Sequence, residues 1–202
     1  FELSATLKAL FGFELRELSP GGGFGVRYVP EDSRMPAEET TGAIARMVCD
    51  AAARFDMASK LPRLTIEPGR SIVGSAGVAI YRVGSIKDIA GVRTYVAVDG
   101  GMADNIRPTA YGARYTPVLA NRLLDPANSR VSIAGKYCES GDVLVHDASL
   151  PMPRVGDLVT LPGSGAYHLA MASNYNLSLR PAVVVVTDGS ARLVRRRETY
   201  AD

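Results

Sequence analysis

The sequence contains only two cysteines, two histidines and no long apolar run, and each scarcity excludes a class of protein. Cys49 and Cys138 are too few for a disulfide framework, which favours a reducing compartment and a cytoplasmic protein. His146 and His168 lack the spacing to cysteine that a zinc site needs, so no metal is expected. No apolar stretch approaches the length of a membrane span, and no secretory signal follows Phe1. A membrane partner is therefore not expected.

Net charge is also small, at +2 over 202 residues. A balance so close to neutral argues against a nucleic-acid-binding surface. The one basic cluster, Arg195-Arg196-Arg197, lies in a strand-like tail and is interpreted as a solvated or edge-protecting face. The sequence has neither a Walker phosphate loop nor a Gly-x-Ser-x-Gly elbow near a histidine and an acid, so neither of those chemistries is expected.

The first 72 residues have the pattern of an α/β unit. We predict a helix at 3–11 closed by Gly12, a strand at 13–18, a helix at 36–55 and a strand at 63–66. The long helix should bury one face, formed by Ile44, Met47, Val48, Ala51, Ala52 and Phe55. Cys49 in this helix is interpreted as inert packing. Strand, glycine-rich loop, helix and strand make a βαβ unit, which favours a parallel sheet with sites at its strand ends.

The sequence pattern of residues 73–202 differs from that of the first part, because β-branched runs alternate with Gly, Asp, Asn and Pro turns. Strands are predicted at 73–83, 92–98, 131–134, 143–146, 158–161, 182–187 and 193–196. A short helix is predicted near 165–174. The chain is thus expected to be a multidomain α+β protein, in which the tail of an α/β domain precedes an antiparallel β domain. Because Phe1-Glu2-Leu3 starts inside a helical pattern without methionine or cap, we expect a fragment of a longer chain.

Two glycine-containing loops in the first part are candidates for binding an anion. Gly21-Gly22-Gly23 lets backbone N–H groups approach a phosphate, although a tight strand-to-helix turn would need the same residues. Glu67-Pro68-Gly69-Arg70 ends the next strand. Its carboxylate and guanidinium could pair with each other, or could hold a zwitterionic ligand at the mouth of an α/β barrel.

Three loops in the second part carry further candidates. Arg107 and Tyr111 could aim together at an acid group, or could cap a carbonyl and pack. Gly163-Ser164-Gly165-Ala166-Tyr167 could form an anion site at a helix start, or simply a cap beside a core tyrosine. Cys138 and Glu139 lie in the loop 135–142 between two strands, where a thiol beside a carboxylate is either a bystander or a soft nucleophile or acid.

The order of these motifs resembles the C-terminal half of the diaminopimelate decarboxylase family, whose members are pyridoxal-phosphate enzymes of the alanine-racemase-like fold type. The resemblance covers essentially all 202 residues. Its most specific part is Cys-Glu-Ser-Gly-Asp at 138–142 together with Glu-Pro-Gly-Arg at 67–70, because related ornithine and arginine decarboxylases typically have Asp after the cysteine. It implies that 1–72 is the C-terminal part of a (β/α)8 TIM-type barrel and that 73–202 is an antiparallel β-barrel or Greek-key domain.

The resemblance also implies a role for each motif. Cys138 would be the proton donor after decarboxylation, and Glu139 would hold the distal amino group. The residues that would contact pyridoxal 5′-phosphate are Gly21, Gly22, Gly23, Glu67, Gly69, Arg70 and Tyr167. The residues that would bind meso-diaminopimelate are Arg70, Arg107, Tyr111, Glu139 and Tyr167. In this family Cys138 and Glu139 would serve the partner's site, so a homodimer with shared active sites is implied.

Two alternatives stay open at this point. The first is a related decarboxylase for another basic amino acid, of the ornithine or arginine type. Glu139 suits the distal ammonium of any of them, whereas Arg107 with Tyr111 suits an extra carboxylate that ornithine lacks. The second is a stand-alone β-rich dimerisation or binding module, which would need a capped first helix of its own.

The isolated chain is predicted to be inactive. Its only lysines are Lys8, Lys60, Lys87 and Lys136, and none follows a barrel-type strand in the context where the family attaches its cofactor. Chain supplied with pyridoxal phosphate and meso-diaminopimelate should therefore form no lysine, as measured by chromatography of the products. Detectable lysine would contradict this prediction.

Overall fold

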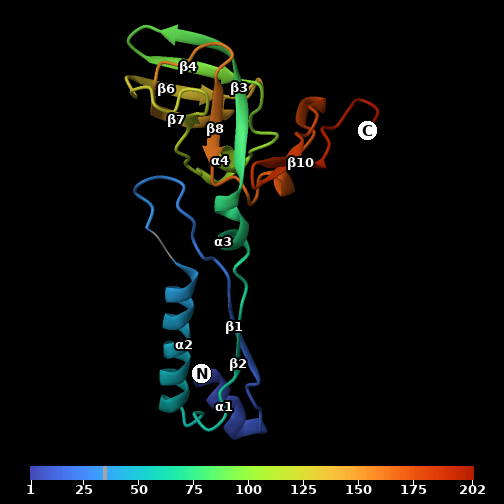
Figure 1. Cartoon of the computed structure of the whole chain (residues 1–202). Coiled ribbons are helices and arrows are strands. Elements are labelled where there is room, and N and C mark those ends of the chain that lie inside the picture. Colours follow the sequence, from blue (N-terminus) through green and yellow to red (C-terminus); the bar gives the residue numbers. More distant parts are fainter. Residues whose placement is uncertain (34–35) are drawn as a thin grey trace. The chain divides into compact units, whose positions relative to one another are not determined.

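The computed structural model describes residues 1–33 and 36–202, which form two compact units. Unit 1 comprises residues 1–27 and 32–73, and unit 2 comprises 28–31 and 74–202. The sequence pattern assigned 28–31 to the α/β part, but in the structure this short segment belongs to unit 2. Each unit is described by itself, with element labels as in Figure 1.

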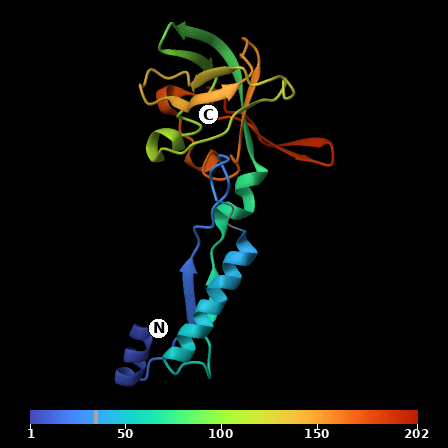
Figure 2. The same ribbon diagram turned by 90° about the vertical axis from the view of Figure 1, so that its left-hand side faces the viewer.

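Unit 1 is built around a parallel pair of strands joined by a helix. Its elements are α1 (Glu2–Phe11), β1 (Glu17–Gly21), α2 (Ala37–Arg54), β2 (Arg63–Ile66) and α3 (Gly69–Val73). β1 pairs in parallel with β2, and α2 runs alongside them (Figures 1 and 2). The predicted βαβ arrangement is therefore confirmed, since parallel neighbours need a crossover connection of this kind.

Local sequence signals located the helices of unit 1 well but missed details of one strand and one face. α1 ends where predicted, at Gly12 in the left-handed conformation (φ 65°). The strand predicted at 13–18 instead occupies Glu17–Gly21, so the first glycine of the glycine run lies inside it. On α2, Val48 and Ala52 are buried four residues apart, whereas Met47 is 69% exposed because it lies about 100° around the helix from Val48.

Cys49 is also exposed, so its interpretation as inert packing was wrong. It follows the buried Val48 and therefore turns away from the face that Val48 and Ala52 bury.

Unit 2 contains a six-stranded sheet and a separate hairpin. Its elements are a 3-10 turn (Gly74–Ala76), β3 (Val78–Ile89), β4 (Arg93–Val98), α4 (Arg107–Tyr111), β5 (Val118–Leu119), β6 (Ser129–Ala134), β7 (Val143–Leu150), β8 (Leu158–Pro162), 3-10 turns at Leu169–Met171 and Tyr175–Leu177, β9 (Val183–Thr187) and β10 (Ser190–Arg195). The sheet order is β5-β8-β3-β4-β6-β7, and β9 pairs with β10. In both views this hairpin projects from the six-stranded sheet (Figures 1 and 2).

Unit 2 departs from the predicted pattern in several elements, and strand β5, for example, was not predicted. Residues 73–76 are helical, and the strand predicted from Val73 begins only at Val78. β4 pairs with β6 in parallel, while the other pairs are antiparallel, because the long connection through α4 and β5 carries the chain across before β6 begins. Instead of the short helix predicted near 165–174 there is a 3-10 turn at Leu169–Met171, and a second 3-10 turn follows at Tyr175–Leu177.

The core of unit 2 lies on one face of this curved sheet. Inward side chains alternate along the strands, as in Tyr81 and Val83 of β3 and Val96 and Val98 of β4. The fully buried members include Val96, Ile133, Val159 and Leu161. No helix in the described part of the chain is long and apolar enough to cross a membrane.

The C-terminal tail is anchored by one carboxylate. Glu198 accepts hydrogen bonds from the backbone N–H of Arg180 at 2.8 Å, from Asn174 Nδ2 at 2.7 Å and from Arg195 Nη2 at 2.9 Å. The Arg180 N–H first, then Asn174 and the Arg180 guanidinium, lower the pKa of Glu198 to about 2. Arg196 pairs with Asp202. Two of the three tail arginines are thus engaged by acids, rather than simply solvated.

Candidate active site

Arg107, the first residue of α4, lies inside a cage of tyrosine rings in unit 2. Its guanidinium carbon is 4.7 Å from the ring centre of Tyr28 and 5.9 Å from those of Tyr115 and Tyr167. Aromatic faces attract a cation at these distances. The residue is only 9% exposed, yet no carboxylate pairs with it anywhere in residues 1–33 or 36–202. The cage therefore shields a positive charge but does not neutralise it.

A chain of hydrogen bonds connects this guanidinium to two further buried side chains. Arg107 Nη1 donates to Tyr115 Oη at 2.8 Å, and Tyr115 Oη lies 3.0 Å from His168 Nε2. Burial, assisted by the charge of Arg107, lowers the pKa of His168 to about 4, so the imidazole is neutral near pH 7. Asn105 is fully buried beside Tyr115, and its side-chain amide has no hydrogen-bond partner among the described residues.

Tyr167 reaches the cage through an unusual backbone. Its φ is 65°, a left-handed conformation that is costly for a bulky residue. This bend lets consecutive residues serve one cluster, because Tyr167 lies against Arg107 while His168 bonds to Tyr115. In an extended strand the two side chains would point to opposite faces.

The glycines before Tyr167 serve packing, and two of the N–H groups that could have bound an anion there are already bonded. A Cβ on Gly77 would lie 2.3 Å from the Cα of Gly165, so the two backbones touch directly. The N–H groups of Ser164 and Gly165 donate to the carbonyls of Gly77 and Gly74 at 2.8 and 3.0 Å. Both are thereby occupied.

The structure does not bring Tyr111 into the cage. Arg107 and Tyr111 are the two ends of the short helix α4, and Tyr111 is 68% exposed, so it is not packed in a core. The helix is fastened instead through Thr109, whose hydroxyl donates to the carbonyl of Gly141 at 2.8 Å. This bond links α4 to the cysteine loop.

The cysteine loop, residues 135–142, is held from within by Asp142. Asp142 is 3% exposed and accepts from the N–H groups of Met102 at 2.7 Å and Tyr137 at 2.8 Å. A Cβ on Gly135 would come within 2.1 Å of this carboxylate, so the turn requires glycine there. Burial raises the pKa of Asp142 in spite of the two donors.

A second, half-buried carboxylate braces the same region. Asp104 accepts from Tyr81 Oη at 2.6 Å and from the N–H of Gly101 at 2.8 Å. Burial raises the pKa of Asp104. Burial first, and then the nearby charge of Asp104, raise the pKa of Tyr81. The loops after β4 and β6 are thus fastened to each other and to the core.

Cys138 and Glu139 project from this braced loop into solvent. Cys138 is a free, exposed thiol, and Glu139 is exposed as well. Tyr175 donates its hydroxyl hydrogen to Glu139 Oε1, and this bond raises the pKa of Tyr175 to about 12. Tyr175 also packs edge-on against Tyr137 at 5.6 Å. The arrangement presents a thiol and an oriented carboxylate on a rigid base.

Unit 1 holds the remaining predicted residues at the ends of its two strands. A Cβ on Gly22 would lie 2.0 Å from the carbonyl oxygen of Glu67, the residue after β2, so Gly22 has no room for a side chain. Ser19 Oγ donates to Glu67 Oε1 at 2.9 Å. No ion pair joins Glu67 to Arg70 in the described residues; Gly69 and Arg70 instead begin α3, with Arg70 half-buried.

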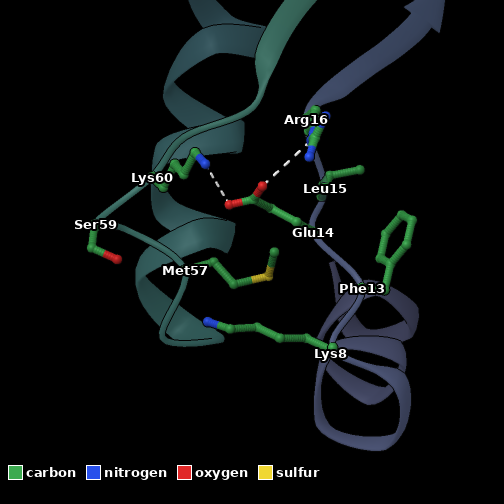
Figure 3. A pocket seen from close by; sticks show the side chains of 9 residues that line it. Lys8, Phe13, Glu14, Leu15, Arg16, Met57, Ser59 and Lys60 are labelled. Carbon is green, nitrogen blue, oxygen red and sulfur yellow. Dashed lines mark hydrogen bonds and ion pairs between the residues drawn. The ribbon is translucent and has the colours of Figure 1, made fainter.

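A pocket in unit 1 does not include any predicted site residue. It lies between the end of α1 and the loop after α2, where Glu14 pairs with Lys60 at 2.5 Å and Arg16 at 3.4 Å (Figure 3). These partners, Lys60 first, lower the pKa of Glu14. No group of three His, Cys, Asp or Glu side chains is arranged to bind a metal within the part of the chain that the structure describes.

Sequence reasoning missed the supporting residues of the site. Tyr28, Tyr115, His168, Asp142 and Tyr175 all contact predicted residues or brace their loops. Asp142 alone had a local signal, as the last residue of Cys-Glu-Ser-Gly-Asp. The others meet their partners only through the fold; Tyr115 and His168, for example, are 53 residues apart.

Comparison with known proteins gives concordant results for both parts of the chain. Residues 46–165 match the family model described as the C-terminal sheet domain of pyridoxal-dependent decarboxylases. Residues 2–74 match the model of their pyridoxal binding domain. A diaminopimelate decarboxylase of Bacillus subtilis is 50% identical over 192 residues, which is 95% of this chain and 43% of that protein.

Solved structures agree with these matches. The chain superposes on a diaminopimelate decarboxylase from M. jannaschii with a TM-score of 0.86 and 34% identity, covering 100% of this chain and 44% of that one. A structure of the M. jannaschii enzyme with L-lysine gives a TM-score of 0.84, with the same identity and coverage. The chain therefore spans less than half the length of these relatives.

We predict that Asp142→Ala destabilises the cysteine loop. The change leaves two enclosed N–H groups without an acceptor, which should lower the free energy of unfolding by about 2–4 kcal/mol. Denaturant unfolding measures this, and limited proteolysis should cut near residues 135–142 faster. The control is Asp88→Ala, an exposed aspartate bonded to Thr94, which should change the free energy by about 0.5 kcal/mol or less. Equal effects of the two changes would contradict the role of Asp142.

Proposed function

Because this chain belongs to the pyridoxal-dependent decarboxylase family, we propose that the full-length protein converts meso-2,6-diaminopimelate into L-lysine and CO2. This reaction is the last step of lysine biosynthesis, and the proposed site of action is the cytoplasm. The name of the Bacillus subtilis relative and the L-lysine bound in the M. jannaschii structure support the choice of substrate and product.

The observation that carries the substrate proposal is the uncompensated charge of Arg107. A buried cation without a counter-ion costs several kcal/mol, so a ligand that supplies an anion gains that energy on binding. Guanidinium groups bind carboxylates through two parallel hydrogen bonds. Diaminopimelate carries a carboxylate at each end. One is lost in the reaction, and the other gives Arg107 its partner.

The residues of unit 1 fit the phosphate end of pyridoxal phosphate. Gly21 and Gly23 have φ values of 81° and 83°, and Gly22 admits no side chain, so this strand end exposes only backbone to a ligand. Glu67 and Arg70, at the end of β2 and the start of α3, would lie beside the cofactor ring and the substrate. When bound, the cofactor supplies an electron sink for the electron pair left by CO2.

Residues of unit 2 would deliver the proton and recognise the distal end of the substrate. Cys138 would protonate the α-carbon through its Sγ, and Glu139, oriented by Tyr175, would hold the distal ammonium group. Tyr167 would contact both cofactor and substrate from the wall of the cage. The exposure of Cys138 and Glu139 in this chain supports a homodimer in which they complete the partner's site.

The two alternatives account for less of the structure. An ornithine-type substrate has no second carboxylate, so Arg107 would keep its uncompensated charge in the complex. A stand-alone binding module would have no use for a free thiol on a loop braced by the carboxylates of Asp142 and Asp104. Tyr111, which lies outside the cage, keeps its proposed substrate contact only through the solvent-facing end of α4.

The substrate proposal predicts a selective loss in Arg107→Gln. The cofactor-loaded full-length protein should decarboxylate meso-diaminopimelate and not L-ornithine. In the variant, kcat/KM for meso-diaminopimelate should fall about a hundredfold or more, since removing one member of a buried charge pair costs about 2–5 kcal/mol. Arg130→Gln, which removes an exposed arginine paired with Asp147, should retain activity. Preference of the wild type for ornithine would refute the proposal.

The proton-donor role predicts a second, separable loss in Cys138→Ala. Turnover of meso-diaminopimelate should slow by about 100- to 10,000-fold, the usual contribution of a positioned acid or base. The visible absorption of the bound cofactor should stay, because the thiol takes no part in holding it. Cys49→Ala, which removes the chain's other exposed cysteine, is the matched control and should leave turnover unchanged. A Cys138→Ala enzyme with wild-type turnover would remove Cys138 from this role.

A further inference from the structure

The bonds of Tyr115 give the hydroxyl a fixed direction. Its oxygen accepts from Arg107 Nη1 at 2.8 Å, and its other neighbour is His168 Nε2 at 3.0 Å. A phenol has one hydrogen to donate, and a neutral imidazole accepts at the nitrogen that carries no proton. Arginine can only donate, and among the hydrogen bonds of the described residues His168 Nε2 is the one acceptor within reach of the Tyr115 hydrogen. We therefore assign that hydrogen to His168, which places the histidine proton on Nδ1.

Tyr115 and His168 are both buried, so the direction of the hydrogen bond between them affects the stability of the site. Tyr115 and His168 are 3% and 8% exposed, and their rings meet edge-on at 5.6 Å. Tyr28 closes the other side of Tyr115, with its ring centre 5.4 Å away. A hydrogen bond removed here is not replaced freely by water, so its loss leaves a buried group unsatisfied.

We propose that Tyr115 and His168 act as a positioning pair, which holds the Arg107 guanidinium in the orientation that binds the substrate's distal carboxylate. The pair sets which N–H groups of Arg107 remain available, because Nη1 is partly committed to Tyr115. It also prevents the Tyr115 hydroxyl from donating to a ligand, because its hydrogen is committed to His168. The identity of the ligand rests on the proposed function; the arrangement of the pair does not.

The arrangement has a consequence for specificity. A carboxylate offers only acceptors and fits an edge made only of donors, whereas a carboxamide brings an NH2 group that would meet N–H groups. Fixing Arg107 should therefore favour a distal carboxylate over its amide. If Arg107 lost its fixed orientation, it should bind the distal carboxylate more weakly. The difference in affinity between the carboxylate and its amide should then become smaller.

The test is a double-mutant cycle in the cofactor-loaded full-length protein. Tyr115→Phe keeps the ring of the cage and removes the hydroxyl, so KM for meso-diaminopimelate should rise about 5- to 20-fold with kcat within about twofold. His168→Leu should have a similar effect, and His168→Gln, which keeps an acceptor, should restore most of the affinity. Either substitution alone breaks the Tyr115–His168 hydrogen bond. The double variant should therefore have a KM no higher than that of either single variant.

Tyr95→Phe is the matched control. Tyr95 is a half-buried tyrosine of β4 whose ring also lies 5.9 Å from an arginine, Arg93, and its KM should stay within about twofold of the wild type. An unchanged KM in Tyr115→Phe would overturn the proposal. So would multiplying effects of Tyr115→Phe and His168→Leu, which would mean two independent packing defects.

A spectroscopic readout separates this inference from the proposed function. Nitrogen NMR of the full-length protein, with the His168 signals identified by their loss in His168→Gln, should give the Nδ1–H tautomer, and Tyr115→Phe should abolish that preference. An Nε2–H tautomer in the wild type would overturn the pair even if meso-diaminopimelate is the substrate. Failure of the wild type to turn over meso-diaminopimelate would instead refute the proposed function, and the tautomer would still decide the pair.

Discussion

A positive charge is expensive to bury, and unit 2 is arranged around one that it shields without neutralising. Tyrosine rings surround Arg107, and a hydroxyl, rather than a carboxylate, accepts its hydrogen bond. The half-buried Asp104 and the buried Asp142 accept hydrogen bonds from loop N–H groups instead. The carboxylates thus stabilise the loops, and the Arg107 guanidinium stays available for a ligand.

The strained and glycine-rich parts of unit 2 lie at these same two places. The left-handed backbone of Tyr167 lets its ring contact Arg107 while the next residue, His168, bonds to Tyr115. Gly135 is required because the Asp142 carboxylate fills the space of a side chain. Backbone strain and missing side chains gather around the charge and around the cysteine loop, as expected where geometry is set for function.

Elements with a strong local pattern could be predicted from the sequence, and those set by distant contacts could not. Helix α2 and strand β2 follow from periodicity, capping and β-branched runs, and Arg107, Tyr167 and Cys138 follow from motif order. The end of β1 was missed because proline and glycine, which usually end strands, are tolerated at Pro20 and Gly21 in this edge strand. Tyr28, Tyr115 and His168 carry no local signal, because their importance comes from ring and hydrogen-bond contacts between separate segments.

One further consequence concerns modularity. The segment 28–31 leaves the connection between β1 and α2, joins unit 2 and returns to unit 1. Its tyrosine lies nearer to the Arg107 guanidinium than the other two rings do. The boundary between the units is therefore crossed three times by the chain, and a recombination or gene fusion that joins foreign sequence at residue 74 would inherit the sheet but lose a wall of the cage.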